Sequence, residues 1–332
     1  MYDRIVTHDD FDGVVSAALV GYFLEIEKIV FAGPGDIANS RVSTGPADIV
    51  CDLPYPLECG MWFDHHEANL EDVALRGIDQ ETIPGLRRPA PSCAHVILEY
   101  FETEYEIDGE LVEMAEASDR IDSFDYESIE DWRRLRPENE IDAAIKLKVG
   151  KPSERKDFLR WLVLSLMDES LEAVAARSDV TQRAELFRAE EEQMLKIIGQ
   201  HLEYPGDEQD IILLDFSGHT RRVNVVKNLA QLLAPQALAV LEINSLFDRQ
   251  VKTNDLAFSM SLTIAGTHHP ARRDLGDIVR TLNIGSGHAG AASGILRSRS
   301  KPEMLKAKER TLKAILEQWK KQGQKGKSGQ AE

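Results

Sequence analysis

The sequence predicts an α/β protein with an N-terminal parallel-sheet domain, a helical linker and a smaller C-terminal α/β domain. Three observations support this class. Apolar runs of strand length alternate with helical stretches through the first 150 residues, which is typical of a parallel sheet covered on both faces. A long segment of helical periodicity follows, and strand signals resume near residue 209. A chain of 332 residues is long enough to bury two hydrophobic cores.

The first domain, residues 1–150, has four predicted strands and three predicted helices. The strands are short runs rich in apolar and β-branched residues: Asp3–Thr7, Lys28–Ala32, Asp48–Asp52 and Met61–Asp64. The helices have longer apolar or amphipathic patterns: Val14–Glu25, Ala94–Phe101 and Gly109–Ser118. Gly33-Pro34-Gly35 separates two of these elements as a turn.

The linker, residues 151–206, has apolar residues at helical spacing with charges on the other face from Ser153 to about His201. This pattern predicts core-facing helices that join the two domains. The second domain, residues 207–298, has predicted strands at Ile211–Phe216, Ala237–Ile243 and Leu256–Thr263 and predicted helices at Val225–Leu233 and Leu275–Leu282. A glycine-rich loop, 283–294, then leads into a predicted small-residue helix.

Residues 299–332 form a predicted basic amphipathic helix, Met304–Trp319, and a polar tail, Gly323–Glu332, which we expect to be disordered. Arg297–Glu332 holds eleven Lys and Arg against four Glu, whereas the whole chain has a formal net charge of −18. Because non-specific duplex binding needs a basic face, long duplex DNA is disfavoured as a partner. A small anionic substrate stays compatible with the charge, since divalent cations can reverse the local field.

The cellular setting is indicated by the cysteines and by the absence of long apolar runs. Three cysteines with no Cys-x-x-Cys spacing suit a reducing compartment. No run has transmembrane length, and no charged-then-apolar leader opens the chain. We therefore expect a cytoplasmic protein with no membrane partner. An amphipathic C-terminal helix and an exposed sheet edge make a homodimer a further expectation.

Ionisable side chains gather at the ends of the predicted elements. His8, Asp10 and Asp12 occupy alternate positions in the turn after the first strand, so they point the same way. Such groups repel one another unless a cation lies between them; a solvated acidic turn is the alternative for this stretch alone. Similar groups follow at other element ends: Asp52, Asp64, His65, His66 and Asp119. In an open parallel sheet, the carboxyl ends of the strands form one ligand-binding crevice.

This ordered set of motifs resembles the DHH phosphoesterase superfamily, in particular its RecJ-like and nanoRNase-like members. The motifs are His8-x-Asp10-x-Asp12-Gly13, then Asp52, then Asp64-His65-His66, then Asp119, and finally Gly285-Ser286-Gly287-His288. The last of these resembles the DHH-associated C-terminal domain of that superfamily. The resemblance covers residues 1–298, and it implies an active site in the cleft between the two domains.

The resemblance also implies two Mn²⁺ ions, with Mg²⁺ as the alternative, and a role for each motif residue. The metal ligands would be His8 and Asp10 for one ion, Asp12, His65 and Asp119 for the other, and Asp52 as a bridge. Asp122 and Asp125 are close rivals of Asp119. Asp64 would orient His65, and His66 would face the substrate phosphate. Substrate would also contact Gly285, Ser286, Gly287 and His288. Oxygen and imidazole ligands without thiolate suit manganese or magnesium.

The expected function is that of a hydrolase: a manganese-dependent, nucleotide-binding phosphoesterase with nuclease-type activity. It would cut phosphodiester bonds of short oligonucleotides or (cyclic) dinucleotides by a two-metal-activated hydroxide, with Asp52, Asp64 and His66 as catalytic residues. The alternatives are an exopolyphosphatase or phosphoadenosine-type phosphatase, and a nucleotide-sensing regulatory binding protein with a dead site. Exonuclease activity on long single-stranded DNA is disfavoured by the net charge and by the short segment after residue 298, although the basic tail leaves this alternative open.

One further cluster, His219 with Arg221 and Arg222, follows a predicted strand in the second domain. Exposed arginines are common on any surface, which favours plain surface positions. Binding of a phosphate or nucleotide is the alternative.

Overall fold

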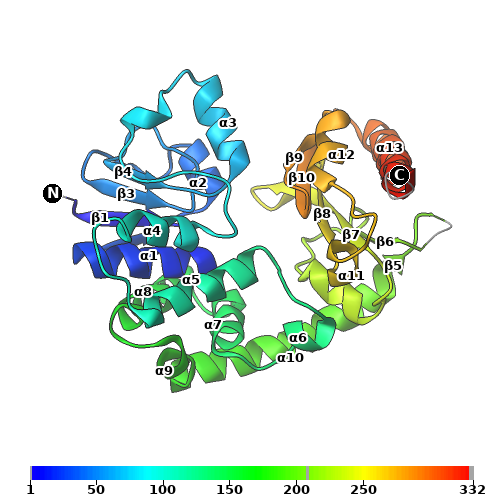
Figure 1. Ribbon diagram of the computed structural model, residues 1–332. Coiled ribbons are helices and arrows are strands. Elements are labelled where there is room, and N and C mark those ends of the chain that lie inside the picture. Colours follow the sequence, from blue (N-terminus) through cyan, green and yellow to red (C-terminus); the bar gives the residue numbers. More distant parts are fainter. Residues whose placement is uncertain (1, 207–208, 329–332) are drawn as a thin grey trace. The chain divides into compact units, whose positions relative to one another are not determined.

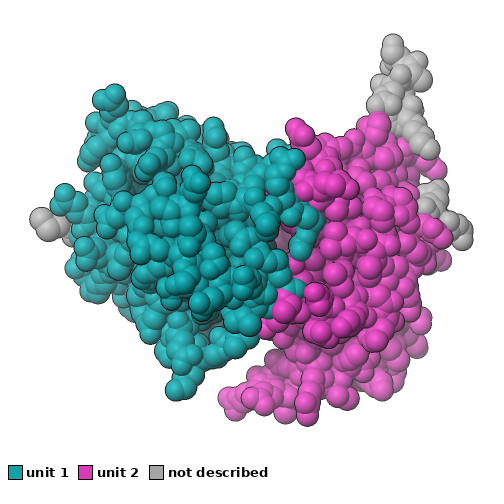
Figure 2. All heavy atoms as spheres, turned by 90° about the horizontal axis from the view of Figure 1, so that it is seen from below, with its two compact units in different colours: residues 1–125, 133–188 teal, residues 126–132, 189–332 magenta. Residues whose placement is uncertain are grey.

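The computed structural model describes residues 2–206 and 209–328 (Figure 1). The chain divides into two compact units, coloured teal and magenta in Figure 2. Unit 1 comprises residues 1–125 and 133–188, and unit 2 comprises residues 126–132 and the chain from residue 189 onward. The division falls within helix α10 (Ser178–His201), in the segment that the sequence predicts as a helical linker.

Unit 1 contains a four-stranded parallel sheet, which confirms the predicted α/β class. The strands, in the order in which they lie side by side, are β2 (Ile29–Phe31), β1 (Arg4–Thr7), β3 (Asp48–Cys51) and β4 (Met61–Phe63). Their apolar side chains are almost completely buried because helices cover the sheet. Parallel pairing brings the carboxyl ends of β1, β3 and β4 to the same edge, since Thr7 pairs with Cys51 and Cys51 with Phe63.

The helices of unit 1 are α1 (Phe11–Leu24), α2 (Pro34–Ala38), α3 (Glu67–Leu75), α4 (Cys93–Phe101), α5 (Gly109–Asp122), α7 (Pro137–Lys146), α8 (Pro152–Asp168), α9 (Leu171–Ala175) and the first part of α10. A single 3₁₀ turn, η1 (Gln80–Thr82), follows α3. The segment predicted as a helical linker thus consists of three helices, α8, α9 and α10. Ser170 begins α9 by accepting a hydrogen bond from the Ala173 amide, which separates it from α8.

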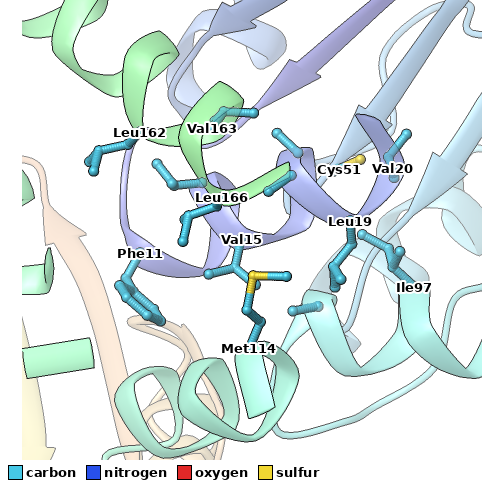
Figure 3. Packing of buried hydrophobic residues seen from close by; sticks show 14 of the residues in the cluster. Phe11, Val15, Leu19, Val20, Cys51, Ile97, Met114, Leu162, Val163 and Leu166 are labelled. Atoms are coloured by element: carbon cyan, nitrogen blue, oxygen red, sulfur yellow. The ribbon is translucent and has the colours of Figure 1, made fainter. Parts of the chain in front are cut away.

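Helix α1 is the centre of the unit 1 core. Its sequence is apolar all round after Asp12, so nearly every residue is buried. Figure 3 shows Val15 and Leu19 of α1 among side chains from three other helices, namely Leu162, Val163 and Leu166 of α8, Met114 of α5 and Ile97 of α4. This packing fixes the first turn of α1 against the carboxyl ends of the strands.

Unit 2 contains a six-stranded mixed sheet in which β6 and β7 pair in parallel and the other neighbouring strands pair antiparallel. The order is β5 (Leu202–Glu203), β6 (Ile211–Asp215), β7 (Ala239–Asp248), β8 (Val251–Leu262), β10 (Ala291–Leu296) and β9 (Gly285–Gly287). Its helical segments are α6 (Ile129–Trp132), the second part of α10, η2 (Lys227–Leu232), α11 (Ile264–Thr267), α12 (Leu275–Thr281) and α13 (Lys301–Ser328). One sheet face forms a core with α12 and α13.

The glycine-rich segment differs from its prediction, because residues 285–296 form the hairpin β9–β10 and no small-residue helix. Glycine is required at position 285, since a Cβ there would lie 2.0 Å from the Ser293 carbonyl oxygen of β10. The predicted helix Val225–Leu233 is the 3₁₀ segment η2. A segment of glycine, serine and alanine has little hydrophobic periodicity, so its sequence does not distinguish a hairpin from a helix.

Helix α13 continues through Gly323 to Ser328, where the sequence predicts a disordered tail; residues 329–332 of that tail lie outside the described residues. Its apolar side packs on the sheet through Met304, Ile315 and Trp319. Throughout residues 2–206 and 209–328, each helix is either too short or too polar to cross a membrane.

Candidate metal centre

The turn between β1 and α1 is held in one conformation by its own hydrogen bonds. Asp10 caps the helix by accepting from the Gly13 amide at 3.0 Å. The Thr7 hydroxyl donates to the Gly13 carbonyl at 2.7 Å. Gly13 comes so close to His8 that a Cβ would lie 2.2 Å from the His8 carbonyl oxygen. The turn thus presents His8, Asp10 and Asp12 from a rigid backbone.

Gly13→Ala should therefore destabilise the protein, because the backbone of His8 would have to move. We expect a loss of about 1–3 kcal/mol in the free energy of unfolding, measured by urea denaturation in EDTA. Gly109→Ala, in the first turn of α5, is the matched control because a Cβ there meets nothing within 4 Å. Equal stability of the two variants would contradict this account of the turn.

Arg155 of α8 holds the same turn from outside. It donates to the Asp9 carboxylate and, at 2.7 Å, to the Asp9 carbonyl oxygen. Two bonds from one guanidinium fix both the side chain and the backbone of Asp9. The sequence contains no signal for this contact, since 146 residues separate the two partners.

Arg155→Lys should weaken metal binding without unfolding the chain, because an ammonium cannot reproduce the two-pronged contact with Asp9. We expect the Kd for Mn²⁺ to rise about 10-fold, the lower range for residues that orient metal ligands, in titration calorimetry. Arg177→Lys is the control, since Arg177 makes an exposed ion pair with Glu169. An unchanged Kd in Arg155→Lys would show that the turn does not need this contact.

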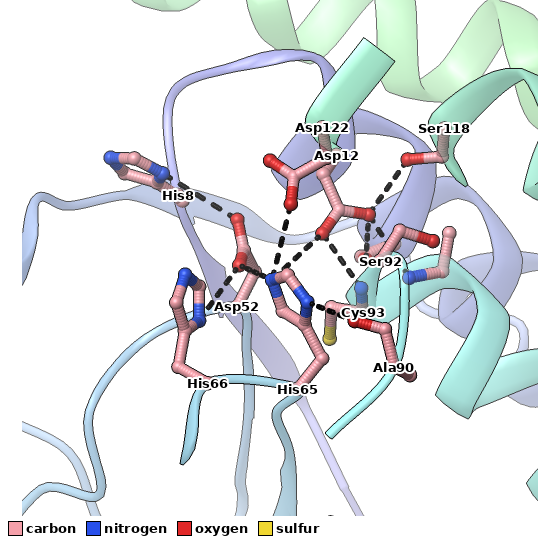
Figure 4. Close-up of polar contacts among 12 residues, drawn as sticks. His8, Asp12, Asp52, His65, His66, Ala90, Ser92, Cys93, Ser118 and Asp122 are labelled. Atoms are coloured by element: carbon pink, nitrogen blue, oxygen red, sulfur yellow. Dashed lines mark hydrogen bonds and ion pairs between the residues drawn. The ribbon is translucent and has the colours of Figure 1, made fainter. Parts of the chain in front are cut away.

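Asp12 projects from α1 into a buried cradle at the N-terminus of α4 (Figure 4). Its carboxylate accepts from the Cys93 amide at 2.7 Å, the Ala94 amide at 3.0 Å and the Ser118 hydroxyl at 2.7 Å. Burial and the nearby Asp52 carboxylate raise the pKa of Asp12 to about 6. The two amides are the unpaired donors of a helix start, which stabilise an anion there.

Asp52 and His65 face each other beneath the turn. Asp52 follows β3 with a positive φ of 55°, and His65 follows β4. Asp52 Oδ1 lies 3.5 Å from His65 Nε2. Both atoms are buried, and neither has a hydrogen-bond partner among the described residues. A buried donor or acceptor without a partner is costly, so these two atoms mark a place for an additional ligand.

The ligand atoms form three groups, each with its members within 4.8 Å of one another. The groups are His8, Asp10 and Asp52; Asp52, His65 and His66; and Asp12, His65 and Asp122. Asp52 is shared by the first two and His65 by the last two. Adjacent positions for cations would therefore be joined through these two side chains (Figure 4).

The electrostatics of this centre are those of a carboxylate cluster balanced by imidazoles. Burial alone would lower the pKa of His65, but Asp52, Asp12 and Asp122 raise it to about 10. The pKa of His8 is raised to about 11 by Asp10 and Asp52, also against burial. Since imidazole must be neutral to bind a metal, cation binding would release protons from these rings.

Asp64 orients the pair of histidines that follows it. One oxygen accepts from the His66 ring Nδ1 at 2.8 Å and from the His65 amide at 2.9 Å, and the other accepts from Asn69 at 2.6 Å. The sequence predicts that Asp64 orients His65. In the structure, Asp64 holds the ring of His66, and the His65 ring is held instead by the Ala90 carbonyl at 3.0 Å.

Asp122, and not the first-ranked Asp119, lies among the candidate metal ligands in the structure. Asp119 lies outside the three groups, where Ser92 donates to it at 2.6 Å and His95 Nδ1 lies 2.9 Å away. Asp122, one turn later on α5, lies 3.4 Å from His65 Nε2. Asp125, the other rival, is in none of the groups found among the described residues.

The predicted substrate segment, Gly285–His288, belongs to the hairpin of unit 2. Ser286 is exposed on β9, and the His288 ring accepts from the Gly290 amide at 3.2 Å. Arg280 of α12 donates to the Gly287 carbonyl at 2.8 Å. Contact of these residues with a substrate is still a prediction.

The residues present fit divalent cations. The donors are carboxylate oxygens and imidazole nitrogens, which suit manganese or magnesium. The two unpartnered buried atoms, Asp52 Oδ1 and His65 Nε2, lie where two of the groups meet. Sequence reasoning missed the cradle of Asp12, although Ser92 before the apolar run Cys93–Phe101 was a recognisable helix start.

Comparison with models of known protein families finds no match, and comparison with curated proteins finds none either. Solved structures do match. The pGpG-specific phosphodiesterase PggH from Vibrio cholerae superposes with a TM-score of 0.65 at 22% identity, over 94% of this chain and 99% of that one. RecJ in complex with Mn²⁺ from Thermus thermophilus superposes with a TM-score of 0.51 at 14% identity, over 95% of this chain and 52% of that one.

These likenesses show the fold. The chain shares its fold with PggH and with RecJ, so the predicted resemblance to RecJ-like proteins is confirmed at the level of the fold. It matches PggH over nearly the whole of both chains, whereas it spans about half the length of the Thermus RecJ chain.

Proposed function

We propose that this chain is a metal-dependent phosphoesterase that hydrolyses phosphodiester bonds in short oligonucleotides or dinucleotides. The observation that supports it best is the sharing of Asp52 and His65 among three groups of metal-type ligands. Divalent cations bound there would lower the pKa of a water molecule and neutralise charge on the phosphate oxygens. His8, Asp10 and Asp52 would hold one cation, and Asp12, His65 and Asp122 the other, with Asp52 between them.

The remaining side chains of the centre position these ligands and the substrate. Asp64 accepts a hydrogen bond from His66 Nδ1, which leaves Nε2 to face a ligand. Burial opposes the charged ring, but Asp64 raises the pKa of His66 and favours the imidazolium. Its Nε2–H would donate to a non-bridging phosphate oxygen and stabilise the charge that grows there during hydrolysis. The His66 side chain is 46% exposed, so a substrate can reach it.

Two observations support a short nucleotide as the substrate class. PggH, which the chain matches nearly end to end, is a phosphodiesterase specific for pGpG. The net charge of −18 disfavours tracking along a long polyanion. Both observations support a short nucleotide as the substrate.

A substrate panel with added Mn²⁺ tests the proposal. It should contain a linear dinucleotide, a cyclic dinucleotide, a five-nucleotide RNA, a long single-stranded DNA and polyphosphate, with Asp12→Ala as the inactive control. We expect turnover of the short nucleotides only, and loss of that turnover in the control. Turnover of polyphosphate alone would replace the proposal with an exopolyphosphatase. No turnover of any substrate, with Mn²⁺ bound, would favour a nucleotide-sensing binding protein.

A further inference from the structure

A row of polar side chains crosses four neighbouring strands of the unit 2 sheet (strands in Figure 1). Glu242 of β7 pairs with Ser259 of β8, Ser259 pairs with Ser293 of β10, and Ser293 pairs with Ser286 of β9. Directly paired residues share one face of a sheet. The alternate residues of the same strands face the apolar core on the other side. The polar row is therefore a feature of one face only.

Three functional groups meet at the β7 end of this row. Lys227, the first residue of η2, donates from Nζ to the Ser259 hydroxyl. Asn244, two residues after Glu242 and on the same face, donates to Glu242 Oε1 at 2.7 Å. All of these side chains are half-buried, so a ligand can reach them. The ammonium keeps further N–H bonds, and Glu242 Oε2 accepts no hydrogen bond from the described residues.

The charges of this group are only partly compensated. Burial lowers the pKa of Lys227 to about 8, against the attraction of Glu242. Burial also raises the pKa of Glu242, although Asn244, Lys227 and Arg222 act in the opposite direction. Half-buried charged groups whose charge is offset only in part are costly for folding alone. Their arrangement is better explained by a ligand that supplies the missing hydrogen bonds.

The ligand must present an acceptor beside donors. An isolated phosphate would be repelled by Glu242, and a cation by Lys227. A guanine base satisfies both groups, because its O6 acceptor lies next to the N1–H and N2–H donors. Adenine presents the reverse order, so its N1 lone pair would face the carboxylate. Bases of single-stranded or short nucleotides expose these edges for recognition.

We infer that Lys227 and Glu242 form a guanine-recognition site, with Lys227 donating to O6 and Glu242 accepting from N1–H and N2–H. Asn244 is a positioning residue that orients the Glu242 carboxylate. This inference rests on the proposed function and adds that the substrate carries a guanine base. The hydroxyls of Ser259, Ser293 and Ser286 continue from this site toward the hairpin over three strand spacings, roughly 14 Å, a length suited to a dinucleotide.

Binding in EDTA tests the site independently of hydrolysis. The full chain is titrated with linear dinucleotides that differ only in base: guanine, hypoxanthine and adenine. We expect guanine to bind tightest, hypoxanthine about 10-fold more weakly because it lacks the 2-amino donor, and adenine at least about 100-fold more weakly. Equal binding of the three, or binding of none, would overturn the inference.

Substitutions test whether Lys227 and Glu242 cause the preference for guanine. Glu242→Gln should remove most of the guanine-over-adenine preference, since an amide can donate to adenine N1, and Lys227→Met should weaken binding of guanine and hypoxanthine alike. Glu309→Gln is the matched control, because Glu309 is exposed on α13 of the same unit. Thermal melting checks that each variant is folded. A Glu242→Gln protein that is folded and still selects guanine would contradict the assignment.

The guanine site and the proposed phosphoesterase function can be refuted independently of each other. Hydrolysis of bis-p-nitrophenyl phosphate with Mn²⁺ in a chain without base preference would refute the guanine site alone. Selective guanine binding in a chain that hydrolyses no phosphodiester would refute the proposed function alone.

Discussion

Asp52→Asn should abolish manganese-dependent hydrolysis, with kcat/KM falling at least ~1,000-fold. Asp52 is the carboxylate shared by two of the three ligand groups, and it is almost completely buried. Asparagine has the same shape and tolerates the positive φ of 55° at this position. The substitution therefore removes the charge while the backbone stays in place. Calorimetry should show weaker binding of Mn²⁺ as well.

The control for this prediction is Asp3→Asn, which removes an exposed carboxylate paired with Lys28 near β1 and should leave activity unchanged. Melting temperatures in EDTA separate a loss of the centre from a loss of the fold. Near-normal turnover of a folded Asp52→Asn protein would show that Asp52 does not join two cations.

Asp122→Asn should reduce hydrolysis at least ~100-fold, whereas Asp119→Asn should reduce it about 10-fold or less. The two carboxylates are one helical turn apart on α5, but only Asp122 faces His65, at 3.4 Å. Asp119 instead accepts from Ser92, which begins α4, so its loss would act indirectly through the cradle of Asp12. The Kd for Mn²⁺ should follow the same order in titration calorimetry.

The pair of variants forms its own control, because both remove one carboxylate from the same helix. The larger loss in Asp119→Asn would restore Asp119 as the fourth-motif ligand, as the sequence ranks it. Equal losses would mean that both carboxylates are required for metal binding.

The sequence predicted the first sheet well because its strands are buried on both faces. Runs such as Ile49–Cys51 are continuous in apolar residues, and three of the four strands, β1, β3 and β4, are followed directly by an ionisable residue at the carboxyl edge. The positions of His8, Asp12 and Asp52 follow from these strand ends. Parallel pairing then brings such residues to one edge of the sheet.

The sequence could not separate Asp119 from Asp122, because the choice depends on the rotation of α5 about its axis. Both residues follow the apolar stretch Leu111–Ala115, and a shift of three positions keeps a side chain on nearly the same helix face. Only the packing of α5 against α1 and α4 decides which carboxylate reaches His65.

Long-range contacts are the second reason why the sequence did not predict parts of the site. The contact of Arg155 with Asp9 and the cradle of Asp12 at Cys93 join residues 146 and 81 positions apart. In neither pair does the local sequence around one residue predict its contact with the other. The polar row of unit 2 likewise appears only when the strand registers of Glu242, Ser259 and Ser286 are known.

The most direct test of the proposed chemistry is hydrolysis of a linear dinucleotide in ¹⁸O-labelled water, with Mn²⁺ and with EDTA, followed by mass spectrometry of the products. We expect turnover only with Mn²⁺ and one ¹⁸O in the new phosphomonoester, because in the proposed reaction water would attack phosphorus at the centre formed by Asp12, Asp52 and His65. Turnover that persists in EDTA, or no turnover with Mn²⁺ bound, would contradict it.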